Sequence, residues 1–226
     1  MIVNEIFYSI QGEGKLAGVP SVFIRLAGCP LRCKWCDTKY AWPPTSGDEM
    51  TVEQIKAEVV KHPASHVVIT GGEPFASGQL KELTVALANA NKYITIETNG
   101  LKFIDGLSCD LMSISPKLAN SVPEETKLSE EHKKHIGDIA AIRRLMDNYK
   151  YQLKFVVDTP ADLDDIAQCI EKLNNVNPYQ ICLMPQAITR SEYIAKSQFL
   201  AEICKRAGFA LSPRLQVLLW EGQRGK

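Results

Sequence analysis

Short apolar runs alternate along this chain with segments whose apolar residues recur at helical spacing, and this alternation constrains the fold more than any other feature. The predicted strands are residues 21–26, 66–70, 93–98, 111–115, 153–157 and 180–184. The predicted helices lie near residues 51–60, 80–87, 132–148, 160–170 and 191–207. Near-continuous apolar strands between amphipathic helices indicate a parallel sheet covered on its faces.

The number of these units narrows the architecture further. About six β–α alternations fall short of the eight in a closed barrel. We therefore predict the α/β class, with a partial (βα)6-type barrel and a mainly parallel sheet, and a doubly wound sheet is the alternative. Neither a linker nor a repeat interrupts the 226 residues, so residues 1–226 are predicted to form a single domain. Either arrangement places ligands at the carboxyl ends of the strands.

Local signals set several element boundaries. Thr51 begins a sequence typical of a capping box, and Pro160 is predicted to occupy the first position of a helix. Residues 117–131 are polar and without clear period, which indicates a surface loop. Residues 213–220 form an apolar closing segment of undefined type.

Charge and targeting signals exclude several classes of function. Lys plus Arg and Asp plus Glu number 26 each, and a chain without net positive charge is a poor candidate for direct nucleic-acid binding. Residues 1–5 lack the start of a signal peptide, and no stretch approaches the roughly 18 apolar residues that a membrane helix needs. We therefore expect a cytoplasmic protein with no membrane partner.

Three of the seven cysteines are crowded into one short segment. Cys29, Cys33 and Cys36 follow a Cys-x3-Cys-x2-Cys spacing, which in a reducing cytosol indicates a metal or redox site. Thiolates select zinc, copper(I) or iron–sulfur clusters. Structural zinc normally takes four ligands, whereas three thiolates on a cluster leave one iron open. A zinc site and ordinary buried thiols remain the alternatives. The other four cysteines, Cys109, Cys169, Cys182 and Cys204, are scattered and are interpreted as ordinary thiols.

With Trp35 just before the last of these cysteines, the segment resembles the signature of the radical S-adenosylmethionine superfamily. Residues 70–74, Thr-Gly-Gly-Glu-Pro, follow a predicted strand and are similar to the superfamily's Gly-Gly-Glu turn. The resemblance implies a [4Fe-4S] cluster held by Cys29, Cys33 and Cys36, with S-adenosylmethionine chelated by the open iron. The 5′-deoxyadenosyl radical formed on reduction would abstract a hydrogen from the substrate.

A narrower resemblance, to the 7-carboxy-7-deazaguanine synthase family, rests on motifs spread along the chain. They are residues 8–14, 23–29, 36–38 and 115–117, with Leu219, Trp220, Arg224 and Gly225 near the other end. The resemblance implies conversion of 6-carboxy-5,6,7,8-tetrahydropterin to 7-carboxy-7-deazaguanine with loss of ammonia, in queuosine biosynthesis. S-adenosylmethionine would be regenerated in each cycle. The family commonly ends in an apolar residue where this chain has Lys226, so no role is assigned to the terminal carboxylate.

The same resemblance implies roles for individual residues, with none catalytic beyond the cofactor chemistry. The expected substrate contacts are Ile10, Gln11, Gly12, Arg25 and Thr70. The expected contacts to S-adenosylmethionine are Trp35, Cys36, Asp37, Gly72, Glu73, Ser115, Pro116 and Lys117. Thr38 is expected to bind Mg²⁺, which prefers hard oxygen ligands. Residues 97–100 are either a ribose contact or only a turn.

Physical chemistry leaves alternatives beside these roles. Arg25 lies in an apolar strand and needs an anionic partner, either the substrate carboxylate or a structural salt bridge. Thr38 is either a Mg²⁺ ligand or a turn residue that caps its own backbone. The expected partners are the pterin, an electron donor such as flavodoxin or ferredoxin, and a second copy of the chain in a homodimer. Two other functions stay open: a glycyl-radical-activating enzyme acting on a protein, and a non-catalytic zinc-binding module.

Overall fold

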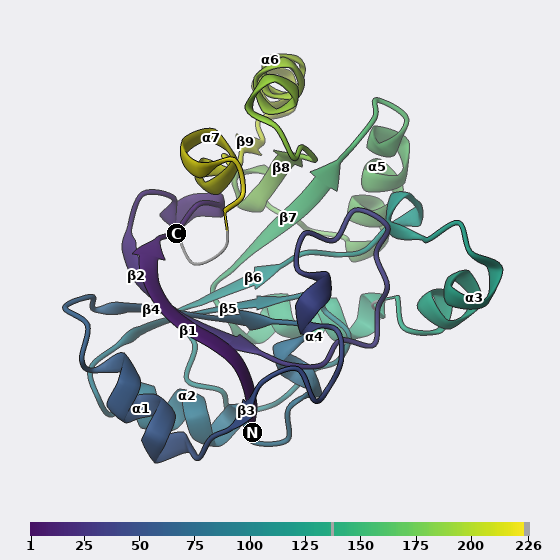
Figure 1. Cartoon of the computed structure of the whole chain (residues 1–226). Coiled ribbons are helices and arrows are strands. Elements are labelled where there is room, and N and C mark those ends of the chain that lie inside the picture. Colours follow the sequence, from purple (N-terminus) through teal and green to yellow (C-terminus); the bar gives the residue numbers. More distant parts are fainter. Residues whose placement is uncertain (137, 224–226) are drawn as a thin grey trace.

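The computed structural model describes residues 1–136 and 138–223, and its centre is one nine-stranded sheet (Figure 1). The strands are β1 (Ile2–Ile10), β2 (Pro20–Leu26), β3 (Asp48–Glu49), β4 (His66–Gly71), β5 (Tyr93–Thr98), β6 (Leu111–Ile114), β7 (Tyr151–Val157), β8 (Ile181–Pro185) and β9 (Ala210–Leu211). The helices are α1 (Val52–Val59), α2 (Leu80–Ala88), α3 (Thr126–Lys134), α4 (Ile139–Asn148), α5 (Asp162–Leu173), α6 (Arg190–Ala207) and α7 (Leu215–Trp220). Short 3₁₀ helices include η1 (Gly14–Leu16), η2 (Lys39–Ala41), η3 (Pro74–Ala76), η4 (Ala119–Ser121) and η5 (Pro178–Gln180).

The order of the strands selects between the two predicted architectures. The sheet runs β3-β1-β2-β4-β5-β6-β7-β8-β9, and every pair from β2 to β9 is parallel. A doubly wound sheet requires the order to reverse, and here it advances in one direction after β2. The α/β class with a mainly parallel sheet is confirmed, and the unreversed order is that of a partial barrel.

The two faces of the strands have different neighbours because side chains alternate along a strand. Val22 and Ile24 of β2, like Val67 and Ile69 of β4, are fully buried in the main core. Residues at the intervening positions, such as Phe23 and Val68, line a cavity instead. The amphipathic helix α1 adds Val52, Ile55 and Val59 to the core, and the capping box at its start is present as predicted.

Several predicted boundaries were wrong. Strand β1 was not predicted, and the segment interpreted as a surface loop includes η4 and part of α3. The helix predicted near residues 132–148 is two helices, α3 and α4. Pro160 precedes α5 because the Asp162 carboxylate accepts the backbone N–H groups of Asp158 and Thr159, which forms a turn before the helix. The closing segment contains helix α7.

Within the described ranges, none of the helices combines the length and the apolar character that crossing a membrane would require.

Candidate active site

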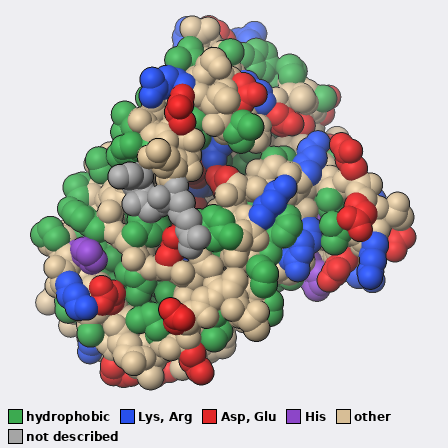
Figure 2. Space-filling view, viewed as in Figure 1, with side chains coloured by type: hydrophobic (Ala, Val, Ile, Leu, Met, Phe, Trp, Pro, Cys, Tyr) green, Lys and Arg blue, Asp and Glu red, His purple; other side chains and the backbone are tan. Residues whose placement is uncertain are grey.

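A cavity of about 550 Å³ opens at the carboxyl ends of the strands, where the surface is hollowed between charged side chains (Figure 2). The predicted residues that line it are Ile10, Gln11, Gly12, Arg25, Cys29, Cys33, Trp35, Cys36, Asp37, Thr38, Thr70, Gly72, Glu73, Ser115 and Lys117. Pro116 is buried and does not belong to this lining. The fold therefore brings almost all of the predicted residues, from five separate segments, to one place.

The cysteine loop between β2 and η2 forms one wall of the cavity. Its path is fixed at its start, where Gly28 and Cys29 donate backbone N–H groups to the carbonyls of Ala41 and Trp42. The Arg32 guanidinium holds the loop from within by donating to the carbonyl oxygens of Cys29 and Leu31, at 2.6 and 2.8 Å. This local bonding lets three cysteines face one cavity without regular secondary structure.

The chemistry of the three thiols fits a cluster of positive metal ions. Burial raises the pKa of Cys29 to about 12 and that of Cys33 to about 11, and the negative charge of neighbouring thiolates adds to both effects. Burial also raises the pKa of Cys36. Three such thiolates form together only if a cation is bound among them, and soft sulfur favours iron–sulfur clusters, zinc or copper(I). Among the described residues, no three His, Cys, Asp or Glu side chains are grouped so as to hold a single metal ion.

The Gly71-Gly72-Glu73 turn at the end of β4 packs tightly against the cysteine loop. A side chain at Gly72 would collide with the backbone carbonyl oxygen of Gly28 and lie 2.9 Å from that of Ala41. Gly71 has φ of +144°, a conformation that residues with side chains rarely adopt. Only glycine therefore allows β4 to end against the loop, which leaves backbone groups facing the cavity.

Glu73 is rigidly placed beside this turn. Its carboxylate accepts the Thr98 hydroxyl at 2.7 Å and the backbone N–H groups of Phe75 and Asn99 at 3.0 and 2.8 Å. Burial raises the pKa of Glu73, although these three hydrogen bonds oppose the shift. The Glu73 carboxylate links η3 to the end of β5, so it holds this part of the cavity wall in place without a bound ligand.

Ser115 and Lys117 approach the cysteine loop from the end of β6. The Lys117 ammonium donates to the Ser115 hydroxyl at 2.6 Å and lies 5.5 Å from the centre of the Trp35 ring. Burial lowers the pKa of Lys117, and the Cys33 thiolate opposes this effect. The Trp35 indole N–H donates to the carbonyl of Asn120. These contacts couple the cysteine loop to η4.

The predicted substrate residues occupy the opposite wall. Arg25 of β2 and Thr70 of β4 are neighbours in the parallel register, and both line the cavity. Ile10 ends β1, and Gly12 accepts the backbone N–H of Leu215 from α7. Gly12 and Gln216 approach closely, since a Cβ at Gly12 would lie 3.3 Å from the backbone nitrogen of Gln216 and would displace the end of its side chain.

Arg25 has a partner inside the protein. Its Nε–H donates to the Glu5 carboxylate at 2.7 Å, and the guanidinium lies 5.9 Å from the ring centres of both Phe7 and Tyr40. The structural salt bridge considered from the sequence is therefore present, and it orients the guanidinium at the cavity wall. Thr38 likewise has a local partner, since its hydroxyl donates to Asp37 at 2.9 Å.

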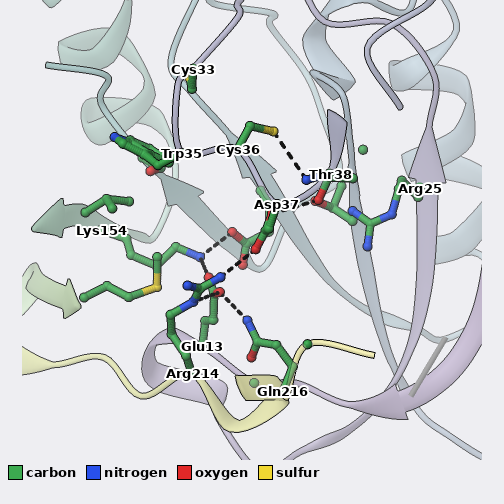
Figure 3. A pocket seen from close by; sticks show the side chains of 18 of the residues that line it. Glu13, Arg25, Cys33, Trp35, Cys36, Asp37, Thr38, Lys154, Arg214 and Gln216 are labelled. Carbon is green, nitrogen blue, oxygen red and sulfur yellow. Dashed lines mark hydrogen bonds and ion pairs between the residues drawn. The ribbon is translucent and has the colours of Figure 1, made fainter. Parts of the chain in front are cut away.

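A buried charge network crosses the base of the cavity, and sequence reasoning missed it. Figure 3 shows Lys154, Arg214 and Gln216 converging on Glu13. Lys154 lies 2.6 Å from Glu13 and 2.7 Å from Glu97, while Arg214 pairs with Asp37 at 2.5 Å. A lysine within the apolar strand 153–157 was the available signal.

The charges of this network hold one another ionised. Burial would raise the pKa of Glu13, but Lys154 and Arg214 outweigh it and lower the value to about 2. For Lys154, burial opposes ionisation and the carboxylates of Glu13 and Glu97 reverse the effect, so its pKa is raised. The cavity base is therefore a fixed pattern of donors and acceptors, suited to a polar heterocycle.

Comparisons with known proteins point to one family over most of the chain. The family model of the radical SAM superfamily matches residues 23–150. A 7-carboxy-7-deazaguanine synthase of Halobacterium salinarum is 39% identical, with 96% of this chain and 90% of that protein covered. One of Rhodopirellula baltica is 36% identical, with 100% and 88% covered. The crystal structure of QueE from Escherichia coli superposes with a TM-score of 0.70 and 27% identity, covering 93% of this chain and 92% of that one.

Proposed function

Because the chain belongs to the 7-carboxy-7-deazaguanine synthase family within the radical SAM superfamily, we propose that its strand-end cavity converts 6-carboxy-5,6,7,8-tetrahydropterin to 7-carboxy-7-deazaguanine. Ammonia is the second product. The observation that carries the proposal is the meeting of three cysteines, the Gly-Gly-Glu turn and Arg25 around one cavity. The relatives named above support this reaction over the glycyl-radical-activating and zinc-module alternatives.

The proposed cofactor side of the cavity is the cysteine wall. Cys29, Cys33 and Cys36 hold the [4Fe-4S] cluster, which with S-adenosylmethionine supplies the radical that takes a hydrogen from the substrate. The remaining proposed contacts to S-adenosylmethionine are Trp35, Asp37, Gly72, Glu73, Ser115, Pro116 and Lys117. Of these, the backbone at Gly72 is accessible because no side chain covers it, and Lys117 supplies a half-buried cation for a carboxylate. Pro116 acts only by fixing the backbone between its two neighbours.

The proposed substrate side is formed by β1, β2 and β4. The Nε of Arg25 is bonded to Glu5, and its terminal guanidinium nitrogens pair with the pterin carboxylate, because a planar fork of donors matches a carboxylate. Gln11 and the backbone at Ile10 and Gly12 hold the ring, and Thr70 contacts it from the neighbouring strand. Thr38 supplies one oxygen to Mg²⁺ beside the substrate, for which its hydroxyl must turn away from Asp37.

The wider setting is proposed on the same basis. Residues 1–226 act as a single domain in the cytoplasm, as a homodimer. A flavodoxin or ferredoxin delivers the electron, and the product enters queuosine biosynthesis. Neither nucleic acid nor membrane takes part directly.

The test uses anaerobically reconstituted protein with the carboxypterin, S-adenosylmethionine, Mg²⁺ and a reductant. Deazaguanine product should accumulate in large excess over 5′-deoxyadenosine, since the radical hydrogen returns to the cofactor. Cys33→Ala should lose both iron and turnover, whereas the matched control Cys109→Ala retains both. A one-to-one yield, or full iron content in Cys33→Ala, would contradict the proposal.

A further inference from the structure

The segment from η4 to α3, to which the sequence analysis assigned no role, makes a set of contacts to the cysteine loop. Helix α3 is almost entirely polar, and His132 is its one buried residue. The His132 side chain is fully buried, although it belongs to a helix whose other side chains face outward or lie half-buried. A helix with so few apolar side chains is not held in place by apolar packing. The hydrogen bonds of His132 must therefore account for the burial of its imidazole.

The hydrogen bonds of His132 define its tautomer. The backbone N–H of Arg32 donates to Nδ1 at 3.0 Å, so Nδ1 carries no proton. Nε2 lies 3.0 Å from the Ser121 hydroxyl, which itself donates to the Leu118 carbonyl at 2.6 Å. Because that hydroxyl proton is already engaged, Nε2 must be the donor to Ser121. The imidazole is thus neutral, accepting a hydrogen bond from Arg32 and donating one to Ser121.

Arg32 lies between the first two cysteines, where the loop has no secondary structure. Its guanidinium is bonded to carbonyls on one side, and its backbone N–H is bonded to His132 on the other. Further along, Lys34 donates its N–H to the Ser121 carbonyl at 3.0 Å. Hence η4 and α3 fix the loop at two backbone positions, one on each side of Cys33.

We propose that His132 is a positioning residue that sets the path of the cysteine loop, and so the retention of the cluster, through its Nδ1 bond to the Arg32 amide. The role in retaining the cluster rests on the proposed function, whereas the hydrogen bond between His132 and Arg32 is present in the structure without the cluster. A loop already ordered by this bond loses less conformational freedom when it binds the cluster. A loop without the bond leaves a buried amide unpaired and is free to move.

Two substitutions separate this role from general packing. In His132→Asn, the Asn side-chain oxygen takes the place of Nδ1 and can still accept the Arg32 amide. In His132→Gln, the terminal amide reaches the place of Nε2, which keeps Ser121 and loses Arg32. His66→Asn is the matched control, because His66 is also buried with both ring nitrogens hydrogen-bonded, in its case to two hydroxyls, but lies at the amino end of β4.

The readout is amide hydrogen exchange of the full-length protein, with and without its cluster, together with the rate of iron release to a chelator. Loss of the amide's partner should make exchange at Arg32 on the order of tenfold faster or more in His132→Gln. Iron should also leave faster in that variant. His132→Asn should stay close to the parent in both measurements, and His66→Asn should lower the melting temperature without affecting Arg32.

Equal behaviour of the Asn and Gln variants, or parental exchange at Arg32 in His132→Gln, would overturn the inference. If His132→Gln does not fold, His132→Ala replaces it: exchange should quicken at Arg32, which loses its acceptor, but not at Lys34, which bonds to the Ser121 backbone carbonyl. Unchanged exchange at Arg32 in that variant also overturns the inference. A parent without iron would instead refute the proposed function, while exchange at Arg32 would still report on His132.

Discussion

Replacing Lys154 with Met would remove the central cation of the buried network. The Lys154 side chain is only 4% exposed and pairs with two carboxylates, those of Glu13 and Glu97, within 2.7 Å. Methionine fills a similar volume, so the substitution leaves little empty space and isolates the loss of charge. Glu13 keeps Arg214 and Gln216 as partners, while Glu97 keeps a hydrogen bond from Gln11.

The magnitude follows from the ionisation of Glu13. Lowering its pKa from 4.5 to about 2 corresponds to about 3 kcal/mol of stability at neutral pH, shared between Lys154 and Arg214. Breaking a buried ion pair by removing one partner typically costs about 3–5 kcal/mol. We therefore expect Lys154→Met to lower the free energy of unfolding by about 3 kcal/mol at pH 7.

The sign of the pH dependence is fixed by the direction of the shift. Because the folded pKa of Glu13 is depressed, its contribution is present above pH 4.5 and is lost as the pH falls through about 2. The variant lacks most of this contribution, so the difference in free energy of unfolding between parent and variant should narrow as the pH falls from 4.5.

The assay is anaerobic urea unfolding of both proteins at pH 7 and at pH 3.5. Lys196→Met is the matched control, because the Lys196–Asp158 pair has a similar distance of 2.6 Å but side chains about 30% exposed. The control should lose less than about 1 kcal/mol. A loss in Lys154→Met as small as in the control, or one independent of pH, would refute the reasoning.

Three further outcomes test the cavity walls. Gly72→Ala should lower the free energy of unfolding by about 1–3 kcal/mol and reduce bound iron, because the methyl group meets the backbone of Gly28 and Ala41, whereas Gly78→Ala, which points into open space, should do neither. Arg25→Lys should raise the KM for the carboxypterin about tenfold or more by losing the bidentate fork, and an unchanged KM would restrict Arg25 to its salt bridge with Glu5. Thr38→Ala should flatten the dependence of rate on Mg²⁺ and Thr38→Ser should preserve it, so a Mg²⁺ titration of the Ala variant that overlays the parent's would exclude the metal role.

Sequence reasoning worked best where chemistry and spacing are local. Cys29, Cys33 and Cys36 lie within eight residues, so their shared position follows from the reach of the chain. The buried strands β4 and β5 were predicted because β-branched apolar runs leave few other structures. Strand β1 was missed because only one of its residues, Val3, is buried, and polar residues interrupt its apolar pattern.

The remaining failures come from long-range contacts. Helix α3 lacks an apolar stripe, so only the partners of His132 explain its position, and one of them, Arg32, lies 100 residues away in the chain. The network around Glu13 likewise joins residues 13, 154 and 214, which share no local pattern. Charge in an apolar strand marks such a residue as unusual, but only the fold identifies its partners.

The contact between the first loop and α7 has a consequence for synthesis of the protein. Gln216 donates to Glu13 across 203 positions of the chain, and Leu215 donates to the carbonyl of Gly12. Since domains emerge from the ribosome from the amino-terminal end, the residues of the cysteine loop are exposed long before α7 exists. The cavity base can close only after Arg214 has left the exit tunnel. A ribosome-bound nascent chain shorter than this could acquire iron while still being unable to enclose a substrate.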